Sequence, residues 1–127
     1  MSPRHRLTRT RHFIHCFSII LLSAFSDTPR ITLAPRDHKV KEGGIISFFC
    51  KASGNPAPEI HWLRNGKRLA GARRFIITDM PHGSVLRIEP VRAGRDDATF
   101  TCVAVNGIGE PAKASASLQV YPNDVRK

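Results

Sequence analysis

One pair of cysteines with a tryptophan between them constrains the fold of this chain more than any other feature. Cys50 and Cys102 lie far apart in the sequence, and Trp62 follows the first of them closely. A disulfide between two such positions can join two stacked β-sheets while the indole ring covers the sulfur atoms. We therefore predict an all-β sandwich that is cross-linked by Cys50 and Cys102, with Trp62 and Phe100 in its core.

Alternating apolar residues support this fold class along most of the chain. From Ile31 to Val120, short stretches with a period of two are separated by turn residues, and no helical period of comparable length competes with them. Turn residues such as Gly54–Pro58 and Asn65–Gly66 end the strands. The pattern is typical of an immunoglobulin-like sandwich. The positions predicted to face its core are Ile46, Phe48, Cys50, Ala52, Ile60, Trp62, Phe75, Ile77, Leu86, Ile88, Ala98, Phe100, Cys102, Ala104, Ala114, Ala116, Leu118 and Val120.

The N-terminal segment differs in composition from the rest of the chain. A basic, arginine-rich start is followed by an apolar run from Phe13 to Phe25, which is typical of a secretory signal. We predict a signal peptide at residues 1–26, an immunoglobulin-like domain at 27–122, and a linker or truncated tail at 123–127. A signal anchor or a mis-joined exon is the alternative, because His15 and Cys16 are unusual in such a run. The run is shorter than the roughly 20 apolar residues of a membrane span.

The cysteine count agrees with export. Cleavage after Ser26 would remove Cys16 and leave Cys50 and Cys102 as an even pair. A disulfide between them implies an oxidising compartment. We therefore expect the protein to be secreted or to lie on the extracellular face of the plasma membrane.

Two parts of the sequence resemble a known receptor family. The stretch from Asp96 to Gly109 resembles the end of an intermediate-set immunoglobulin domain, and Phe100 stands where such domains usually have a tyrosine. The segments Trp62–Arg68 and Ser84–Asp97 are more specific. They are similar to the first immunoglobulin domain of LAR-type receptor tyrosine phosphatases, especially the invertebrate members. The resemblance implies an adhesion or receptor-recognition module of axon guidance and synapse formation.

Those receptors also contain further immunoglobulin domains, fibronectin repeats, a membrane span and cytoplasmic phosphatase domains, which this sequence lacks. A fragment of a receptor, a truncated isoform and an incomplete gene model are all compatible with it. The chain has no Cys-x5-Arg nucleophile motif. We therefore expect no enzymatic activity, and any phosphatase activity would belong to a cytoplasmic region outside this chain.

Basic residues gather where the family binds heparan sulfate. Every charged residue from Arg64 to Arg74 is basic. The turns after the third and fifth strands of such a sandwich lie at the same end of the domain, so later arginines should approach this segment. The resemblance implies binding of heparan sulfate proteoglycans, although Asn65 stands where vertebrate members tend to have a further lysine. An ordinary solvated edge is the alternative. The candidate glycosaminoglycan-binding residues are Arg64, Lys67, Arg68, Arg92 and Arg95.

Other functional classes find less support in the sequence. Arg74 is expected to pair with Asp96 and so to be structural. His38, His61 and His82 lie on separate elements without a ligand partner at zinc spacing, so we expect no metal or other cofactor. The isoelectric point of 10.6 would suit nucleic acid, but the predicted compartment argues against it. The remaining alternatives are protein recognition, including an adjacent immunoglobulin domain, and a structural immunoglobulin spacer.

Overall fold

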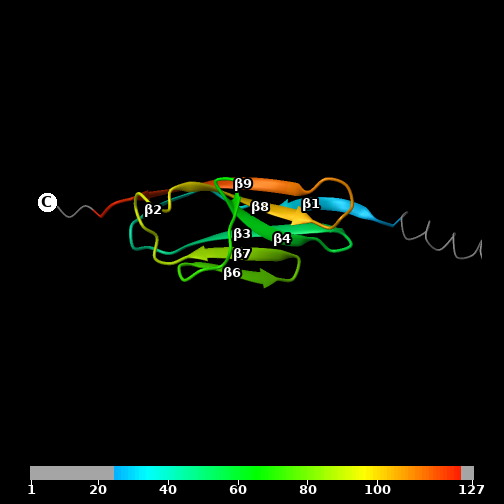
Figure 1. Ribbon diagram of the computed structural model, residues 1–127, viewed down its shortest axis with the longest axis horizontal. Helices are drawn as coiled ribbons and strands as arrows, with labels where there is room; N and C mark the ends of the chain where they lie inside the picture. The colour runs from blue at the N-terminus through cyan, green and yellow to red at the C-terminus, as the bar shows by residue number, and fades with distance from the viewer. Residues whose placement is uncertain (1–24, 124–127) are drawn as a thin grey trace, which may run out of the picture.

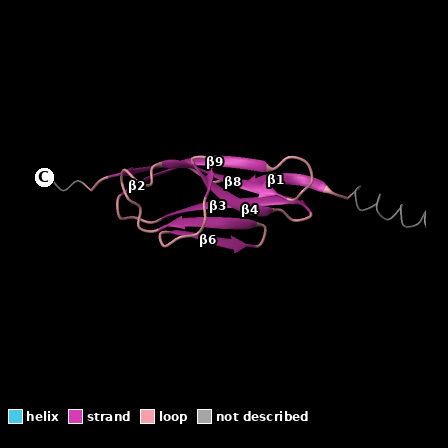
Figure 2. Ribbon diagram, in the orientation of Figure 1, coloured by secondary structure: helices cyan, strands magenta, loops and turns pink. Residues whose placement is uncertain are grey.

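The structure is a computed structural model that describes residues 25–123, in which the alternating segments form strands. The predicted signal peptide and tail lie almost wholly outside this range and stay predictions. The described part consists of strands and loops (Figure 2), and it contains no helix long and apolar enough to span a membrane. The strands are β1 (Asp27–Leu33), β2 (His38–Lys41), β3 (Ile46–Asn55), β4 (Glu59–Arg64), β5 (Lys67–Arg68), β6 (Phe75–Met80), β7 (Gly83–Ile88), β8 (Ala98–Val105) and β9 (Ala112–Tyr121).

The strands form two sheets that pack face to face (Figure 1). Sheet A has the order β1-β3-β7-β6, and sheet B has the order β2-β9-β8-β4-β5. The N-terminal part of the domain changes sheets, because β1 pairs antiparallel with β3 whereas β2 pairs parallel with β9. Pro35 lies in the crossing segment, where its missing N–H group cannot continue a ladder. The sequence analysis did not predict this crossing.

The predicted cross-link and its covering tryptophan are confirmed. Cys50 of β3 and Cys102 of β8 form a disulfide with a Cα–Cα distance of 6.5 Å, which joins the two sheets. Trp62 lies directly opposite Cys102 in the β4–β8 ladder and is fully buried. Its Nε1 donates a hydrogen bond of 2.9 Å to Ser84 Oγ on β7 of the other sheet. The sheets are therefore joined by a covalent bond and by a buried hydrogen bond.

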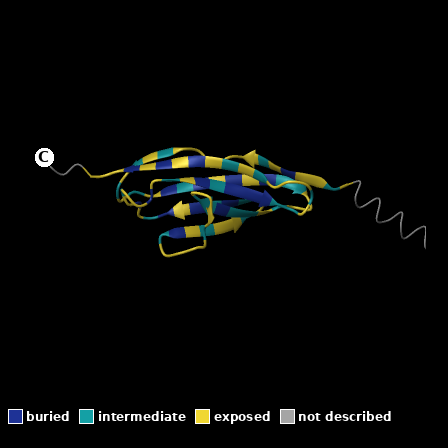
Figure 3. Cartoon of the chain, turned by 45° about the horizontal axis from the view of Figure 1, so that its top comes forward, coloured by how far each residue is buried: buried dark blue, intermediate teal, exposed yellow. Residues whose placement is uncertain are grey.

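The predicted inward positions form the core, and buried and exposed residues alternate along the strands (Figure 3). Ile60, Ile77, Ala98 and Ala114 are only partly buried but pack against this core. Val91 is a fully buried member that the strand pattern did not predict, because it lies in the loop after β7. The burial of these side chains is the main favourable contribution to folding.

The residues after the Asn65–Gly66 turn predict a short strand that holds Leu69, but β5 ends at Arg68, so this prediction is wrong in its bounds. Leu69 N still donates to Trp62 O at 2.9 Å. Phe100 is fully buried, with its ring centroid 5.2 Å from that of Phe48 and 6.4 Å from that of Phe75. A purely aromatic packing therefore occupies the position that a tyrosine usually fills.

The buried Trp62–Ser84 hydrogen bond gives a test of the sandwich. Ser84→Ala removes the acceptor and leaves the indole N–H buried without a partner, which should lower the free energy of unfolding by about 1–3 kcal/mol. Urea denaturation followed by tryptophan fluorescence measures the change. Ser115→Ala is the matched control, because that hydroxyl bonds Thr101 on an exposed face, and its effect should stay within about 0.5 kcal/mol. Equal losses in the two variants would contradict this assignment.

Candidate functional site

The turn between β4 and β5 places cationic residues at one edge of sheet B. Asn65 and Gly66 have φ angles of 49° and 84°, the left-handed conformation that lets a two-residue hairpin close. Asn65 also ties the turn to β8, since its backbone N–H donates to Thr99 O at 2.8 Å and its Oδ1 accepts from Thr99 N at 3.0 Å. Asn65 thus has a structural role at the position where vertebrate members of the resembling family tend to have a lysine.

Arg64 joins this turn to the segment between β7 and β8. Its guanidinium donates a hydrogen bond to the backbone carbonyl of Arg95 and lies over the ring of Phe75, 5.2 Å from the ring centroid. The predicted approach of the two basic segments is therefore present in the structure. Because Arg64 is half-buried and already bonded within the protein, it positions the two segments rather than presenting its whole charge to solvent.

The segment that carries Arg92 and Arg95 is held in a tight turn. Arg95 N and Asp96 N both donate to Arg92 O, and Gly94 N donates to Asp97 Oδ1 at 3.2 Å. Both arginines are exposed. Among the described residues, Lys67, Arg68, Arg92 and Arg95 form no ion pair.

A buried ion pair anchors the same segment, as predicted. Asp96 is fully buried, and its Oδ2 lies 2.7 Å from Arg74 Nη1, which also donates to Pro90 O at 2.8 Å. Burial alone would raise the pKa of Asp96, but hydrogen bonds from Arg74 and from the Arg92 backbone N–H outweigh it and lower this pKa below its usual value. Asp96 is therefore charged at neutral pH, and Arg74 is occupied by it.

The pleat of the sheet divides the candidate cations between two faces. Lys67 is paired with Arg64, whereas Arg68 is paired with Leu63. Since neighbouring side chains of a strand point to opposite faces, Lys67 shares the side of Arg64 while Arg68 points to the outer face of sheet B. Arg64 and Lys67 thus lie in one turn and Arg92 and Arg95 in the other, and the Arg64 hydrogen bond joins the two turns. Arg68 instead borders an open hollow with Glu59, Asp79 and His82.

Lys41 is a further basic residue near this end, and it was not predicted from the sequence. Gly43 N donates to Val91 O, and Val91 N donates to Gly44 O, both at 2.9 Å. These bonds hold the turn after β2 against the residue that precedes Arg92, and Lys41 is the exposed last residue of β2. No local pattern in the sequence could have indicated this contact, because it depends on the parallel pairing of β2 with β9.

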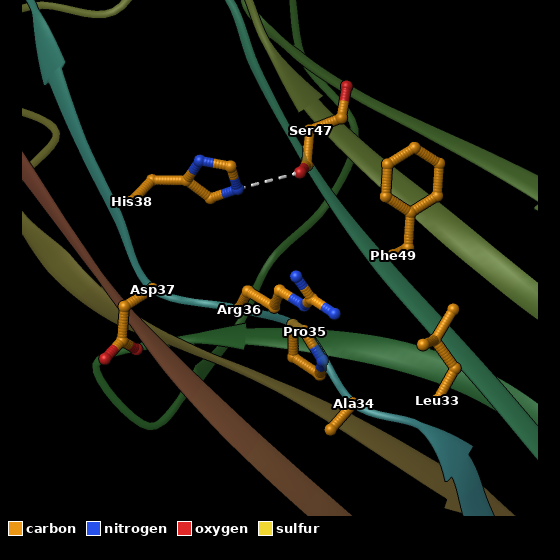
Figure 4. A pocket seen from close by; sticks show the side chains of 8 residues that line it. All are labelled: Leu33, Ala34, Pro35, Arg36, Asp37, His38, Ser47 and Phe49. Carbon is orange, nitrogen blue, oxygen red and sulfur yellow. Dashed lines mark hydrogen bonds between the residues drawn. The ribbon is translucent and has the colours of Figure 1, made fainter.

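A different surface feature lies on the outer side of sheet A. An open hollow of about 400 Å³ is bordered by the crossing segment after β1 and by β3 (Figure 4). In this view Leu33 and Phe49 lie on the same side, and His38 Nε2 donates to Ser47 O at 3.1 Å. Within residues 25–123 no group of three metal-ligating side chains was found. The lining of the hollow is mostly apolar.

Comparison with known proteins gives consistent results. The family model described as "Immunoglobulin I-set domain" matches residues 29–120. The chain is 48% identical over 98 residues to "Tyrosine-protein phosphatase Lar" of Drosophila melanogaster, and 39% identical over 107 residues to "Receptor-type tyrosine-protein phosphatase F" of Mus musculus. These matches cover 76% and 83% of this chain but only 5% and 6% of the respective relatives.

A solved structure shows the same likeness. The structure entitled "Tandem Ig repeats of Dlar" matches with a TM-score of 0.73 and 46% sequence identity, covering 76% of this chain and 50% of that one. The similarity to LAR-type receptors that the motifs indicated is confirmed.

The Arg74–Asp96 pair should contribute strongly to stability. Arg74→Ala would leave the buried Asp96 without its main partner and should lower the free energy of unfolding by about 3 kcal/mol. Thermal unfolding at pH 7 measures this loss. Arg73→Ala is the matched control, because Arg73 is an exposed neighbour, and its melting temperature should be unchanged.

The same pair should give a pH dependence of defined sign. Because the pKa of Asp96 is lower in the folded than in the unfolded state, its contribution is present above the ordinary carboxyl pKa of about 4. It is lost as the pH falls through the lowered value. The stability difference between the wild type and Arg74→Ala should therefore shrink as the pH falls below the ordinary carboxyl range. A difference that stays constant would show that Asp96 is not the group that Arg74 stabilises.

Proposed function

We propose that this chain, which belongs to the immunoglobulin I-set family, is an extracellular recognition domain that binds heparan sulfate chains of proteoglycans. The Mus musculus relative named above is a receptor-type protein, which supports a recognition role at the cell surface. The observation that carries the proposal is the hydrogen bond from Arg64 to the Arg95 carbonyl, since it holds two cationic turns together at one end of the domain.

Exposed cations in and beside the two joined turns suit a sulfated polysaccharide. Each one gains little from a single sulfate in water, but several acting together on one polyanion release many of its counterions. In this arrangement Arg64 positions the two turns, while the charge is offered by Lys67, Arg68, Arg92 and Arg95.

The phosphatase activity in the names of the relatives does not extend to this chain. The match covers about one twentieth of the Drosophila relative, and it is confined to an immunoglobulin domain, which is a non-catalytic fold. The proposed role of this chain is therefore binding.

Protein recognition is the second candidate, and one observation favours it. Leu33, Phe49 and Ile76 are each at least 40% exposed and lie on the outer face of sheet A. Large apolar side chains on one face of a sheet are common at protein interfaces. Saturating heparin should leave such a contact intact and should abolish binding through the cationic turns, which distinguishes the two functions. A structural spacer would show neither contact.

The cationic turns should control retention on heparin. Lys67→Ala combined with Arg68→Ala removes two charges and should weaken heparin affinity about tenfold at physiological salt, with elution at lower salt concentration. The melting temperature should not change, because both side chains are exposed. Isothermal titration calorimetry measures the affinity for heparin, and heparin affinity chromatography measures the salt concentration at which each protein elutes.

A matched double variant controls for net charge. Arg30→Ala combined with Lys51→Ala also removes one arginine and one lysine, but from exposed positions on sheet A. It should elute close to the wild type. If both double variants lose the same affinity, retention reflects the overall charge of the domain and the assigned site is wrong.

A further inference from the structure

The side chain of Arg68 points away from the other candidate cations. It is paired with Leu63, which lies on the outer face of sheet B together with the alternate β4 residues Glu59 and His61. Arg68 borders an open hollow that it shares with Glu59, Asp79 and His82, and the outer face of the sheet continues beside it over β4, β8 and β9. A polyanion that reaches Arg68 would therefore also meet the other residues of this outer face.

A continuous row crosses the face beside Arg68. His61 is paired with Val103, and Val103 is paired with Lys113, so these three residues lie side by side on β4, β8 and β9. Val103 is only 4% exposed although it lies on the outer face, because its two cross-strand neighbours carry longer side chains. His61 is half-buried and Lys113 is exposed. The Lys113 ammonium group and the His61 imidazole therefore lie on either side of the buried Val103 side chain.

Hydroxyl groups occupy the adjoining rows of the same face. Thr101 is paired with Ser115, and their side-chain oxygens are 2.7 Å apart; Thr99 is paired with Ser117. Threonine and serine hydroxyls can both donate and accept hydrogen bonds, as the hydroxyl and sulfate groups of a sulfated sugar require. The outer face thus carries hydroxyl groups together with the positive charges of Arg68 and Lys113, and Glu59 is an acidic residue on it.

We propose that the outer face of sheet B, along Arg68, His61 and Lys113, is a second contact surface for the sulfated polyanion bound by the cationic turns, and that protonation of His61 strengthens this contact. This inference rests on the proposed function and specifies how the same site is extended and regulated. From β5 to β9 the ligand would cross three strand intervals, or about 14 Å, which a short oligosaccharide spans.

The charges around His61 set the direction of the pH effect. Partial burial, followed by the positive charges of Arg68 and Lys113, lowers the pKa of His61 below its usual value. Glu59 is the acidic residue two positions away on β4, and β8 contributes the uncharged Val103. In the free domain the imidazole is neutral at pH 7.5. The negative charge of a bound sulfate chain offsets the positive charges of Arg68 and Lys113 and so favours the protonated form of His61. The affinity of the domain for the chain therefore increases as the pH falls through the range in which histidine titrates.

The test measures binding of a size-defined heparin oligosaccharide to the exported chain by calorimetry at pH 7.5 and pH 5.5. Lys113→Ala should weaken binding about fivefold at both pH values, as expected for the loss of one cation near an anionic ligand. The wild type should bind about fivefold more tightly at pH 5.5, and His61→Gln should lose this gain. Lys51→Ala, an equal charge change on sheet A, should have little effect.

The results separate this inference from the proposed function. If the wild type binds and the Lys67→Ala, Arg68→Ala variant is weakened while Lys113→Ala behaves like Lys51→Ala, the second surface is wrong and the proposed function stands. A pH gain that persists in His61→Gln overturns the role of His61. Absence of heparin binding by the wild type removes both proposals. Should His61→Gln fold poorly, Lys113→Ala, at an exposed position, still decides whether the face takes part.

Discussion

The disulfide beneath the indole of Trp62 is the constraint on which the rest of the structure depends. It joins β3 of sheet A to β8 of sheet B, and Trp62 lies opposite Cys102 on the neighbouring β4. The Trp62–Ser84 hydrogen bond connects the same two layers a second time. With the spacing of the sheets and the register of β4 against β8 held in this way, the turns at the ends of these strands have defined positions.

The candidate site follows from that register. Because β4 and β8 are held side by side, the turn after β4 is brought to the start of β8, where Asn65 and Thr99 exchange hydrogen bonds. The Arg74–Asp96 pair then orders the segment before β8 through the Arg92 backbone N–H. Hydrogen bonds and an ion pair therefore fix the backbone of the turns that carry the exposed cations, which would reduce the conformational entropy lost if a ligand binds there.

Prediction from the sequence succeeded where the physical signal is local. A period of two identifies a half-buried strand, and for that reason β3, β4 and β6 to β9 were found with their inward residues. The crossing from β1 to β2 was missed. It depends on the parallel pairing of β2 with β9, which is distant in sequence and produces no recognisable pattern in the residues around β2. Val91 was missed because it lies in the loop after β7, outside any alternating pattern, although its side chain belongs to the core.

The sequence by itself determined the sandwich and its cross-link, because residue spacing encodes both directly. Its resemblance to immunoglobulin domains indicated that Arg74 is a structural residue. Only the tertiary structure decided which cations share a face. Arg64 and Arg68 belong to the same basic segment, yet one bonds the Arg95 carbonyl and the other joins the row of His61 and Lys113. The physical reason is the pleat: alternate side chains point to opposite sides, and their neighbours there come from strands that are distant in sequence.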